Sequence, residues 1–170
     1  MPEPVEEWQK ATQQLNTNWN FPMCFGAIDG ERVSISKPPK SGSEYFDYKA
    51  QNSIAMLALV DADNRFMYIN AGSCGRASDA GIWDRCTLKE GLEQKLLNVP
   101  TTGAPLPFST EWPYVIVGDD AFPLKTYMMK PFPGEDLTAD KRIFNYWLSR
   151  ERRLSLNAFG ILSAKFRIFK

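Results

Sequence analysis

Residues 24–30 read Cys-Phe-Gly-Ala-Ile-Asp-Gly, and residues 114–120 read Tyr-Val-Ile-Val-Gly-Asp-Asp. Each segment is a short apolar run followed at once by an aspartate, Asp29 or Asp119. The run at 114–117 is apolar throughout, as expected at the centre of a sheet that is covered on both faces. Two carboxylates at strand ends favour metal-dependent phosphodiester chemistry, because Mg²⁺ and similar cations prefer oxygen ligands.

Most of the strands expected around these segments form hairpins. Asp29-Gly30 is a two-residue turn signal, so residues 25–28 and 32–36 are predicted to form a tight hairpin. Residues 53–60 and 65–70 are two β-favourable runs with a four-residue connection, which predicts a second hairpin. Residues 37–43 are expected mainly to connect strands, with contact of Ser41 and Ser43 with phosphate as the alternative.

Helical periodicity marks three segments. It is weak at residues 5–16, clearer from the cap signal Ser78-Asp79 to Asn98, and longest at residues 143–168. Residues 99–113 hold four prolines, too many for a regular element, and are predicted to be a loop. The order of strands and helices predicts an α/β fold, a ribonuclease-H-like mixed sheet with antiparallel hairpins and flanking helices.

Composition is that of one globular domain over residues 1–170. The chain has 44% apolar and 24% charged residues. It has no stretch long and apolar enough to span a membrane and no recognisable signal peptide, so we expect the protein to be located inside a cell and to have no membrane partner. It has three cysteines without paired spacing and no histidine. A bound metal is therefore expected to have oxygen ligands.

Charge is unevenly distributed although the net charge is zero. Residues 141–170 carry eight Lys/Arg against the single acid Glu151, which leaves 12 Lys/Arg against 19 Asp/Glu before them. A basic helix beside an acidic site fits a nucleic-acid enzyme, and Arg150, Arg152 and Arg153 are the candidate contacts with the DNA backbone. A solvated basic helix face is the alternative.

Six stretches in order, within residues 20–168, resemble DDE-type transposases of the PIF/Harbinger group. They are Phe-Pro-Met-Cys-Phe-Gly-Ala-Ile-Asp-Gly (21–30), Ala-Leu-Val-Asp-Ala (58–62), Gly-Arg-Ala-Ser-Asp-Ala-Gly-Ile-Trp (75–83), Val-Gly-Asp-Asp-Ala-Phe-Pro-Leu (117–124), Phe-Asn-Tyr-Trp-Leu-Ser-Arg-Glu-Arg-Arg (144–153) and Asn-Ala-Phe-Gly-Ile-Leu (157–162). The resemblance implies a ribonuclease-H-like nuclease that uses three carboxylates with Mg²⁺ or Mn²⁺ on DNA. It also implies a nuclear site and a Myb-like DNA-binding partner protein.

The resemblance assigns Asp29 and Asp119 as the first two catalytic and metal-binding carboxylates. The third, a glutamate, directly precedes the Asn-Ala-Phe-Gly segment in the family, and that position is Leu156 here. Glu151 lies five residues earlier, about 140° away around a helix, so it is not a simple substitute. If residues 143–168 form one helix, Leu156 falls on the polar face and Glu151 on the apolar face.

Three hypotheses follow from these residues. The first is a transposase-derived nuclease domain whose cleavage of DNA is weakened or lost. The second is a domesticated, non-catalytic module that binds DNA or protein, and the third is a decaying copy or fragment, truncated at its ends. Without the family resemblance, Asp29-Gly30 is a turn, Asp119 is a loop or capping residue, and Asp79 begins a helix.

Overall fold

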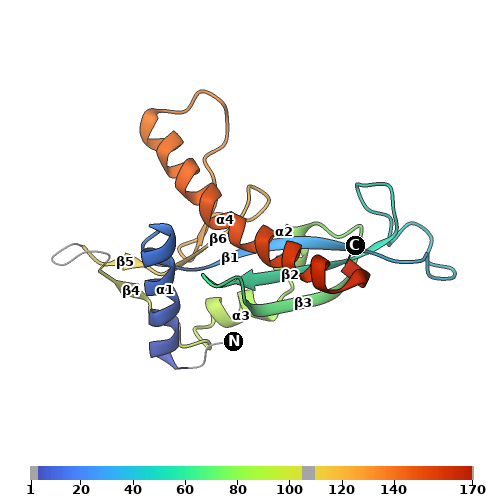
Figure 1. The fold of residues 1–170 in the computed structure, drawn as a ribbon, viewed down its shortest axis with the longest axis horizontal. Helices are drawn as coiled ribbons and strands as arrows, with labels where there is room; N and C mark the ends of the chain where they lie inside the picture. Colours follow the sequence, from blue (N-terminus) through green and yellow to red (C-terminus); the bar gives the residue numbers. More distant parts are fainter. Residues whose placement is uncertain (1–3, 105–109, 170) are drawn as a thin grey trace.

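The computed structural model describes residues 4–104 and 110–169. Within these ranges, strands and helices combine in an α/β arrangement (Figure 1). In chain order the elements are α1 (Val5–Trp19), β1 (Cys24–Ser34), β2 (Ser53–Val60), β3 (Phe66–Cys74), α2 (Asp79–Trp83), α3 (Thr87–Glu93), β4 (Thr102–Gly103), β5 (Trp112–Pro113), β6 (Val115–Val117), β7 (Met128–Met129), α4 (Ala139–Lys165) and the 3₁₀ helix η1 (Arg167–Phe169).

The main sheet has five strands in the order β3-β2-β1-β6-β7. β1 pairs with β2, and β2 with β3, in antiparallel fashion, whereas β1 and β6, and β6 and β7, are parallel. The predicted hairpin of residues 53–60 and 65–70 is confirmed as β2 and β3. This mixed sheet with flanking helices is consistent with the ribonuclease-H-like fold that the sequence predicts.

Both faces of the central strands are covered, because side chains alternate along a strand. In β2, the side chains of Leu57 and Leu59 pack in one cluster with Trp83 and Leu88 from the α2 and α3 segments. The other face of the sheet packs against α4 through Leu154 and its neighbours. α1 contributes to both clusters. The apolar runs of β1, β2 and β6 therefore reflect burial on two sides.

The hairpin predicted at Asp29-Gly30 is wrong. β1 continues through both residues, with Asp29 opposite Ala58 and Gly30 opposite Leu57 in β2. Glycine is needed for a different reason, because a Cβ at Gly30 would overlap the carboxylate of Asp79 at the start of α2. Pairing with a neighbouring strand along this whole stretch outweighs the local turn preference of the dipeptide.

The helix predicted from Ser78 to Asn98 consists of two short helices, α2 and α3. Ser78 is the expected N-cap, since its Oγ accepts a hydrogen bond from the backbone N–H of Gly81 at 3.1 Å. α3 has its own cap, because Cys86 Sγ accepts from the N–H of Lys89 at 3.4 Å. A second cap inside the periodic segment is what divides it.

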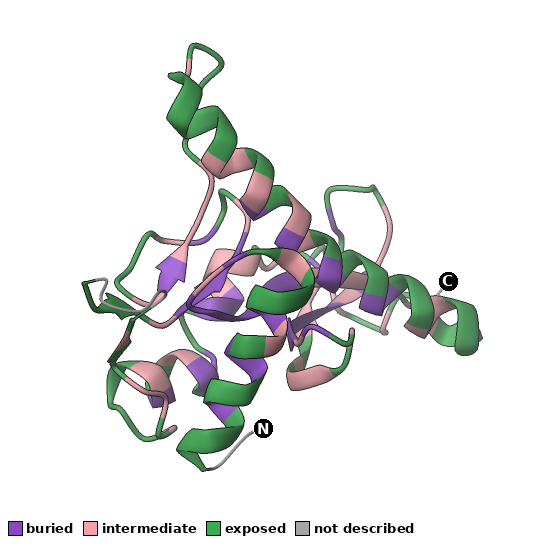
Figure 2. Ribbon diagram, turned by 60° about the vertical axis from the view of Figure 1, so that its left-hand side comes forward, coloured by how far each residue is buried: buried purple, intermediate pink, exposed green. Residues whose placement is uncertain are grey.

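Two further elements differ from prediction at their bounds. The predicted loop at 99–113 includes the short antiparallel pair β4 and β5, and residues 105–109 lie outside the described ranges. α4 begins four residues earlier than predicted and is continuous through Gly160. Its N-terminal part projects from the body of the molecule, and its exposed residues there are coloured green in Figure 2.

Candidate active site

Asp29 lies on the face of the sheet that α4 covers. It follows Ala27 by two residues in β1, so both side chains point to the same side, and Ala27 packs with the α4 residues. The carboxylate is buried. Its Oδ1 accepts a hydrogen bond from the N–H of Gly30 at 2.8 Å, and its Oδ2 accepts from Ser155 Oγ at 3.4 Å. The first predicted carboxylate therefore faces the last helix.

Parallel register brings Asp119 to the same place. Ala27 in β1 pairs with Val117 in β6, and each aspartate comes two residues after its member of that pair. Asp119 lies just past the end of β6, where its Oδ1 accepts from the N–H of Ala121 at 3.0 Å. Its Oδ2 is 3.9 Å from Arg152 Nη2. Two residues that are 90 positions apart in the chain thus lie beside each other, Asp29 within β1 and Asp119 just past the end of β6.

The charge state of Asp29 reflects this crowded setting. Burial raises its pKa from 3.8 to about 6, and the negative charges of Asp119 and Asp79 add to the rise. The hydrogen bond from the Gly30 N–H and the positive charge of Arg152 act in the opposite direction. Asp29 is therefore close enough to feel the charge of Asp119, and a cation beside Asp29 would favour its charged form.

α4 supplies the facing side chains. Arg152, Ser155 and Leu156 are three and four residues apart and therefore share one side of the helix. Arg152 contacts Asp119 and Ser155 contacts Asp29, while the side chain of Leu156 is 57% exposed. The position where the resemblance expects a glutamate thus lies one turn beyond Arg152, with room for a longer side chain.

The three arginines predicted to contact nucleic acid lie in different settings. Arg150 stacks on the ring of Trp147, with its guanidinium carbon 4.9 Å from the centroid. Arg153 is exposed. Arg152 is partly buried and turned toward Asp119, and its Nε has no partner among the described residues. Arg153 is thus the exposed one of the three, whereas Arg150 and Arg152 are partly buried.

Comparison with known proteins bears directly on this arrangement. A family model described as "DDE superfamily endonuclease" matches residues 28–170, which include both aspartates and all of α4. The chain belongs to the DDE superfamily endonucleases. "Protein ALP1-like" from Arabidopsis thaliana is 28% identical over 172 residues, covering 98% of this chain but 41% of that relative. No solved structure matches.

In this DDE domain, Glu151 does not replace the missing glutamate. Its side chain is fully buried on the apolar side of α4, as the helical pattern predicts, and neither carboxylate oxygen has a partner among the described residues. Burial raises its pKa from 4.5 to about 8, with Arg150 acting weakly in the opposite direction. Burial, and then the charge of Glu151, raise the pKa of the Cys24 thiol, so Glu151 lies near the start of β1, away from Asp29 in the middle of the strand.

The donor set of the DDE site fits a hard divalent cation only in part. Among the described residues, no group of three His, Cys, Asp or Glu side chains is placed to hold a metal. Mg²⁺ is nevertheless commonly bound by one or two protein carboxylates, with water and phosphate oxygens completing the shell. Asp29 and Asp119 supply such a pair, and the Ser155 hydroxyl is a further oxygen beside Asp29.

Sequence reasoning missed Ser155 and Arg152 as neighbours of the carboxylates. Their spacing from Leu156 on a helix was the available signal. The sequence also predicted only a helix start for Asp79. In the structure, Asp79 Oδ1 accepts a hydrogen bond from Arg32 Nη1 at 2.9 Å, and Arg32 Nη2 donates to the Ala77 carbonyl oxygen at 2.7 Å. Gly30 lies beneath this ion pair, so Asp79 supports β1 from the face opposite Asp29.

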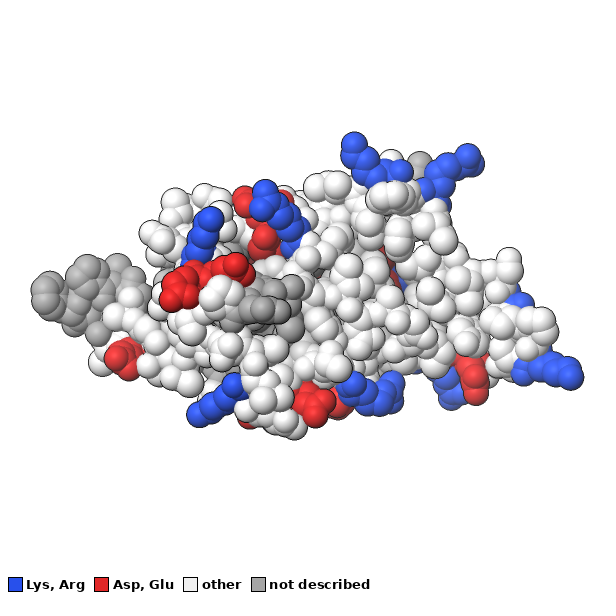
Figure 3. Space-filling view, turned by 90° about the horizontal axis from the view of Figure 1, so that it is seen from below, with Lys and Arg blue, Asp and Glu red and all other residues white. Residues whose placement is uncertain are grey.

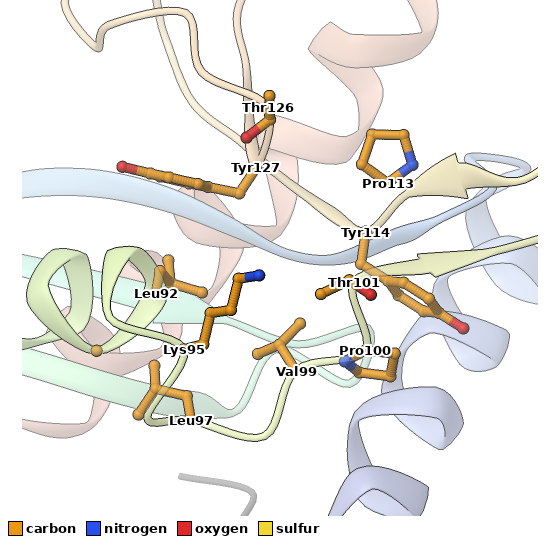
Figure 4. Close-up of a pocket in the computed structure, with 11 residues that line it drawn as sticks. Leu92, Lys95, Leu97, Val99, Pro100, Thr101, Pro113, Tyr114, Thr126 and Tyr127 are labelled. Carbon is orange, nitrogen blue, oxygen red and sulfur yellow. The ribbon is translucent and has the colours of Figure 1, made fainter.

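Cavities elsewhere in the molecule are separate from the carboxylate pair. One of about 260 Å³ lies between the end of α3 and the segments around β5 and β7. Figure 4 shows Lys95 extending into it between Leu92, Tyr114 and Tyr127. None of its lining residues comes from α4.

Among the described residues, no helix is long and apolar enough to cross a membrane.

Proposed function

We propose that this chain is a transposase-derived DDE endonuclease-like domain of the PIF/Harbinger group. Asp29 and Asp119 bind a divalent cation, Mg²⁺ or Mn²⁺, and the substrate is the phosphodiester backbone of DNA. Cleavage is weak or lost because the third carboxylate position is Leu156. The observation that supports this proposal is the parallel pairing of Ala27 with Val117, because each aspartate follows its member of that pair by two residues.

The protein residues have distinct tasks in this proposal. A bound divalent cation stabilises charge on a phosphate oxygen. Asp29 and Asp119 hold the cation and must be ionised to do so. The Ser155 hydroxyl lies 3.4 Å from Asp29 Oδ2 and 2.8 Å from the Arg152 carbonyl oxygen, so it is a second polar group beside the carboxylate. Arg152 places a positive charge beside Asp119, and Arg150 and Arg153 contact backbone phosphates.

A non-catalytic module that binds DNA or protein is the second candidate. Two observations favour it. Leu156 offers no oxygen where the family has a glutamate, and Arg152 already provides a cation beside Asp119. A domain with these two features keeps the fold and the basic helix without the complete catalytic set.

Nicking of supercoiled plasmid in Mg²⁺ or Mn²⁺ separates the two candidates. The variants are Asp119→Ala and Leu156→Glu, with Leu156→Gln as the matched control that adds bulk and polarity but no charge. Weak wild-type nicking that disappears in Asp119→Ala supports a residual nuclease. Nicking gained only in Leu156→Glu shows that the remaining site is competent. Metal-dependent nicking that persists in Asp119→Ala would refute the assignment of the site.

Partner and compartment are also proposals. The chain spans 41% of the length of the ALP1-like relative. From the resemblance to the PIF/Harbinger group, we propose a Myb-like DNA-binding partner and a nuclear site. Co-purification of a Myb-domain protein with the tagged chain from nuclear extract tests both. Exclusion of the tagged chain from the nucleus would count against them.

A further inference from the structure

Residues 35–52, here called the finger, connect β1 to β2 and have a defined internal structure. Asp47 is buried at its centre. Its Oδ2 accepts from Ser53 Oγ at 2.6 Å, and its Oδ1 accepts from the N–H groups of Lys49 and Gln51 at 2.8 and 3.2 Å. Despite burial, these hydrogen bonds hold the pKa of Asp47 below its ordinary value, so an ionised carboxylate organises the finger.

The finger is also fixed to the sheet. The N–H of Ile35 donates to the carbonyl of Asn52 at 2.9 Å, and the N–H of Ser53 donates to the carbonyl of Tyr45 at 2.8 Å. Gly75, after β3, packs so closely that an added Cβ would lie 2.6 Å from the Tyr45 carbonyl oxygen. Long connections in compact domains are uncommon and are usually functional or disordered. The finger is an ordered long connection, because these hydrogen bonds and the close packing of Gly75 fix it to the sheet.

The finger exposes aromatic and cationic side chains. Tyr48 is 80% exposed and Phe46 is 49% exposed, and Lys49 Nζ lies 5.7 Å from the centroid of the Tyr48 ring. Lys37 and Lys40 are exposed as well. Glu44 is the one exposed acid of residues 35–52, since Asp47 is buried. Figure 1 places the finger at the right-hand end of the molecule. In Figure 3 that end shows more Lys and Arg, in blue, than Asp and Glu, in red.

The finger lies beyond the active site on the same strand. Asp29 precedes Ser34, the last residue of β1, by five positions. At about 3.3 Å per residue, the base of the finger is roughly 17 Å from Asp29. Stacked base pairs of DNA rise about 3.4 Å each, so this distance corresponds to about five base pairs. A duplex with one phosphate at the carboxylate pair is long enough to reach the finger.

We propose that the finger is a second DNA contact. Lys40 and Lys49 bind backbone phosphates that lie beyond the base of the finger, at least about five nucleotides from the phosphate at Asp29 and Asp119, and Tyr48 packs against a sugar or base. This inference rests on the proposed function. Exposed aromatics alone would suit an apolar protein surface, but aromatics interleaved with lysines suit nucleic acid, which presents both charge and flat rings.

The test is fluorescence anisotropy of a labelled 30-base-pair duplex titrated with the full chain over a range of salt concentrations. Lys40→Gln/Lys49→Gln is compared with Lys10→Gln/Lys95→Gln, which removes the same charge from exposed lysines outside the finger. Each lost phosphate contact lowers the magnitude of the slope of log Kobs against log salt by about 0.9. We expect a decrease of about 1.8 in the finger variant and none in the control.

Tyr48→Ala gives an independent readout. It keeps the charge, so the salt slope should stay unchanged while Kd rises about fivefold or more. If the wild type binds DNA and both lysine variants have the same slope, the finger inference is wrong and the proposed function stands. If polyglutamate of equal total charge competes with the labelled duplex as well as unlabelled DNA does, the partner of the finger is an acidic protein and the inference is also wrong. No binding of wild type to DNA would instead refute DNA as the substrate.

Discussion

Replacing Glu151 by glutamine should stabilise the protein and remove most of its pH dependence near neutrality. Glu151 is fully buried without a partner for its oxygens among the described residues, and its pKa is raised from 4.5 to about 8. The folded state therefore keeps a proton that the unfolded state releases above pH 4.5. Stability is greatest below that pH, falls as pH rises to about 8, and stays low above it.

The size of the change in stability follows from the shift in the pKa of Glu151. Each pH unit between the two pKa values costs about 1.4 kcal/mol, so Glu151 alone lowers the stability of the wild type by about 3 kcal/mol between pH 4.5 and 7. Glutamine resembles the protonated acid in shape and charge. At pH 7 the variant should thus be about 3 kcal/mol more stable, an upper estimate, since the folded state can relax around the charge.

Urea unfolding at intervals from pH 5 to pH 9 measures this difference. Glu6→Gln, at an exposed position on α1, is the matched control and should leave the pH profile unchanged. A Glu151→Gln variant that is no more stable than wild type at pH 7, or that keeps the same downward slope with pH, would refute the reasoning. It would show that Glu151 is ionised in the folded protein.

Three further predictions concern the carboxylate pair. Gly30→Ala should destabilise the fold by about 1–3 kcal/mol, seen as a lower melting temperature, because its methyl group would overlap Asp79; an unchanged melting temperature would contradict this close packing. Arg152→Gln removes the cation beside Asp119, so Mn²⁺ measured by calorimetry should bind about tenfold more tightly; equal affinity would show that Arg152 and the metal do not compete. Mn²⁺ affinity of the wild type should fall about tenfold per unit below pH 6, because protonation of Asp29 competes with metal; pH-independent binding would place the metal elsewhere.

The buried strands could be predicted from the sequence because burial on two faces leaves a direct compositional trace. Val115–Val117 and Ser53–Val60 are nearly continuous apolar runs, and both are strands of the central sheet. The faces of α4 were also predictable, since helical periodicity alone separates buried Glu151 from exposed Leu156. Strong patterns that extend over a whole element identify it well.

Features that depend on a distant neighbour could not be predicted in the same way. Asp29-Gly30 has the local chemistry of a turn, but β2 pairs along this stretch and Asp79 packs against the glycine. The orientation of Arg152 toward Asp119 depends on how α4 crosses the sheet. The pairing of the two aspartates itself needed a resemblance to known proteins, because no local pattern specifies the register between β1 and β6.

That register has a consequence for how the protein forms. Contacts between segments far apart in sequence form slowly, because a long intervening chain must first be closed. During synthesis, β1 can pair with β2 soon after both emerge, but Asp29 gains its companion only when residues 115–119 have been made and have inserted beside it. The acidic pair is thus assembled late, and a nascent or misfolded chain carries two separated aspartates.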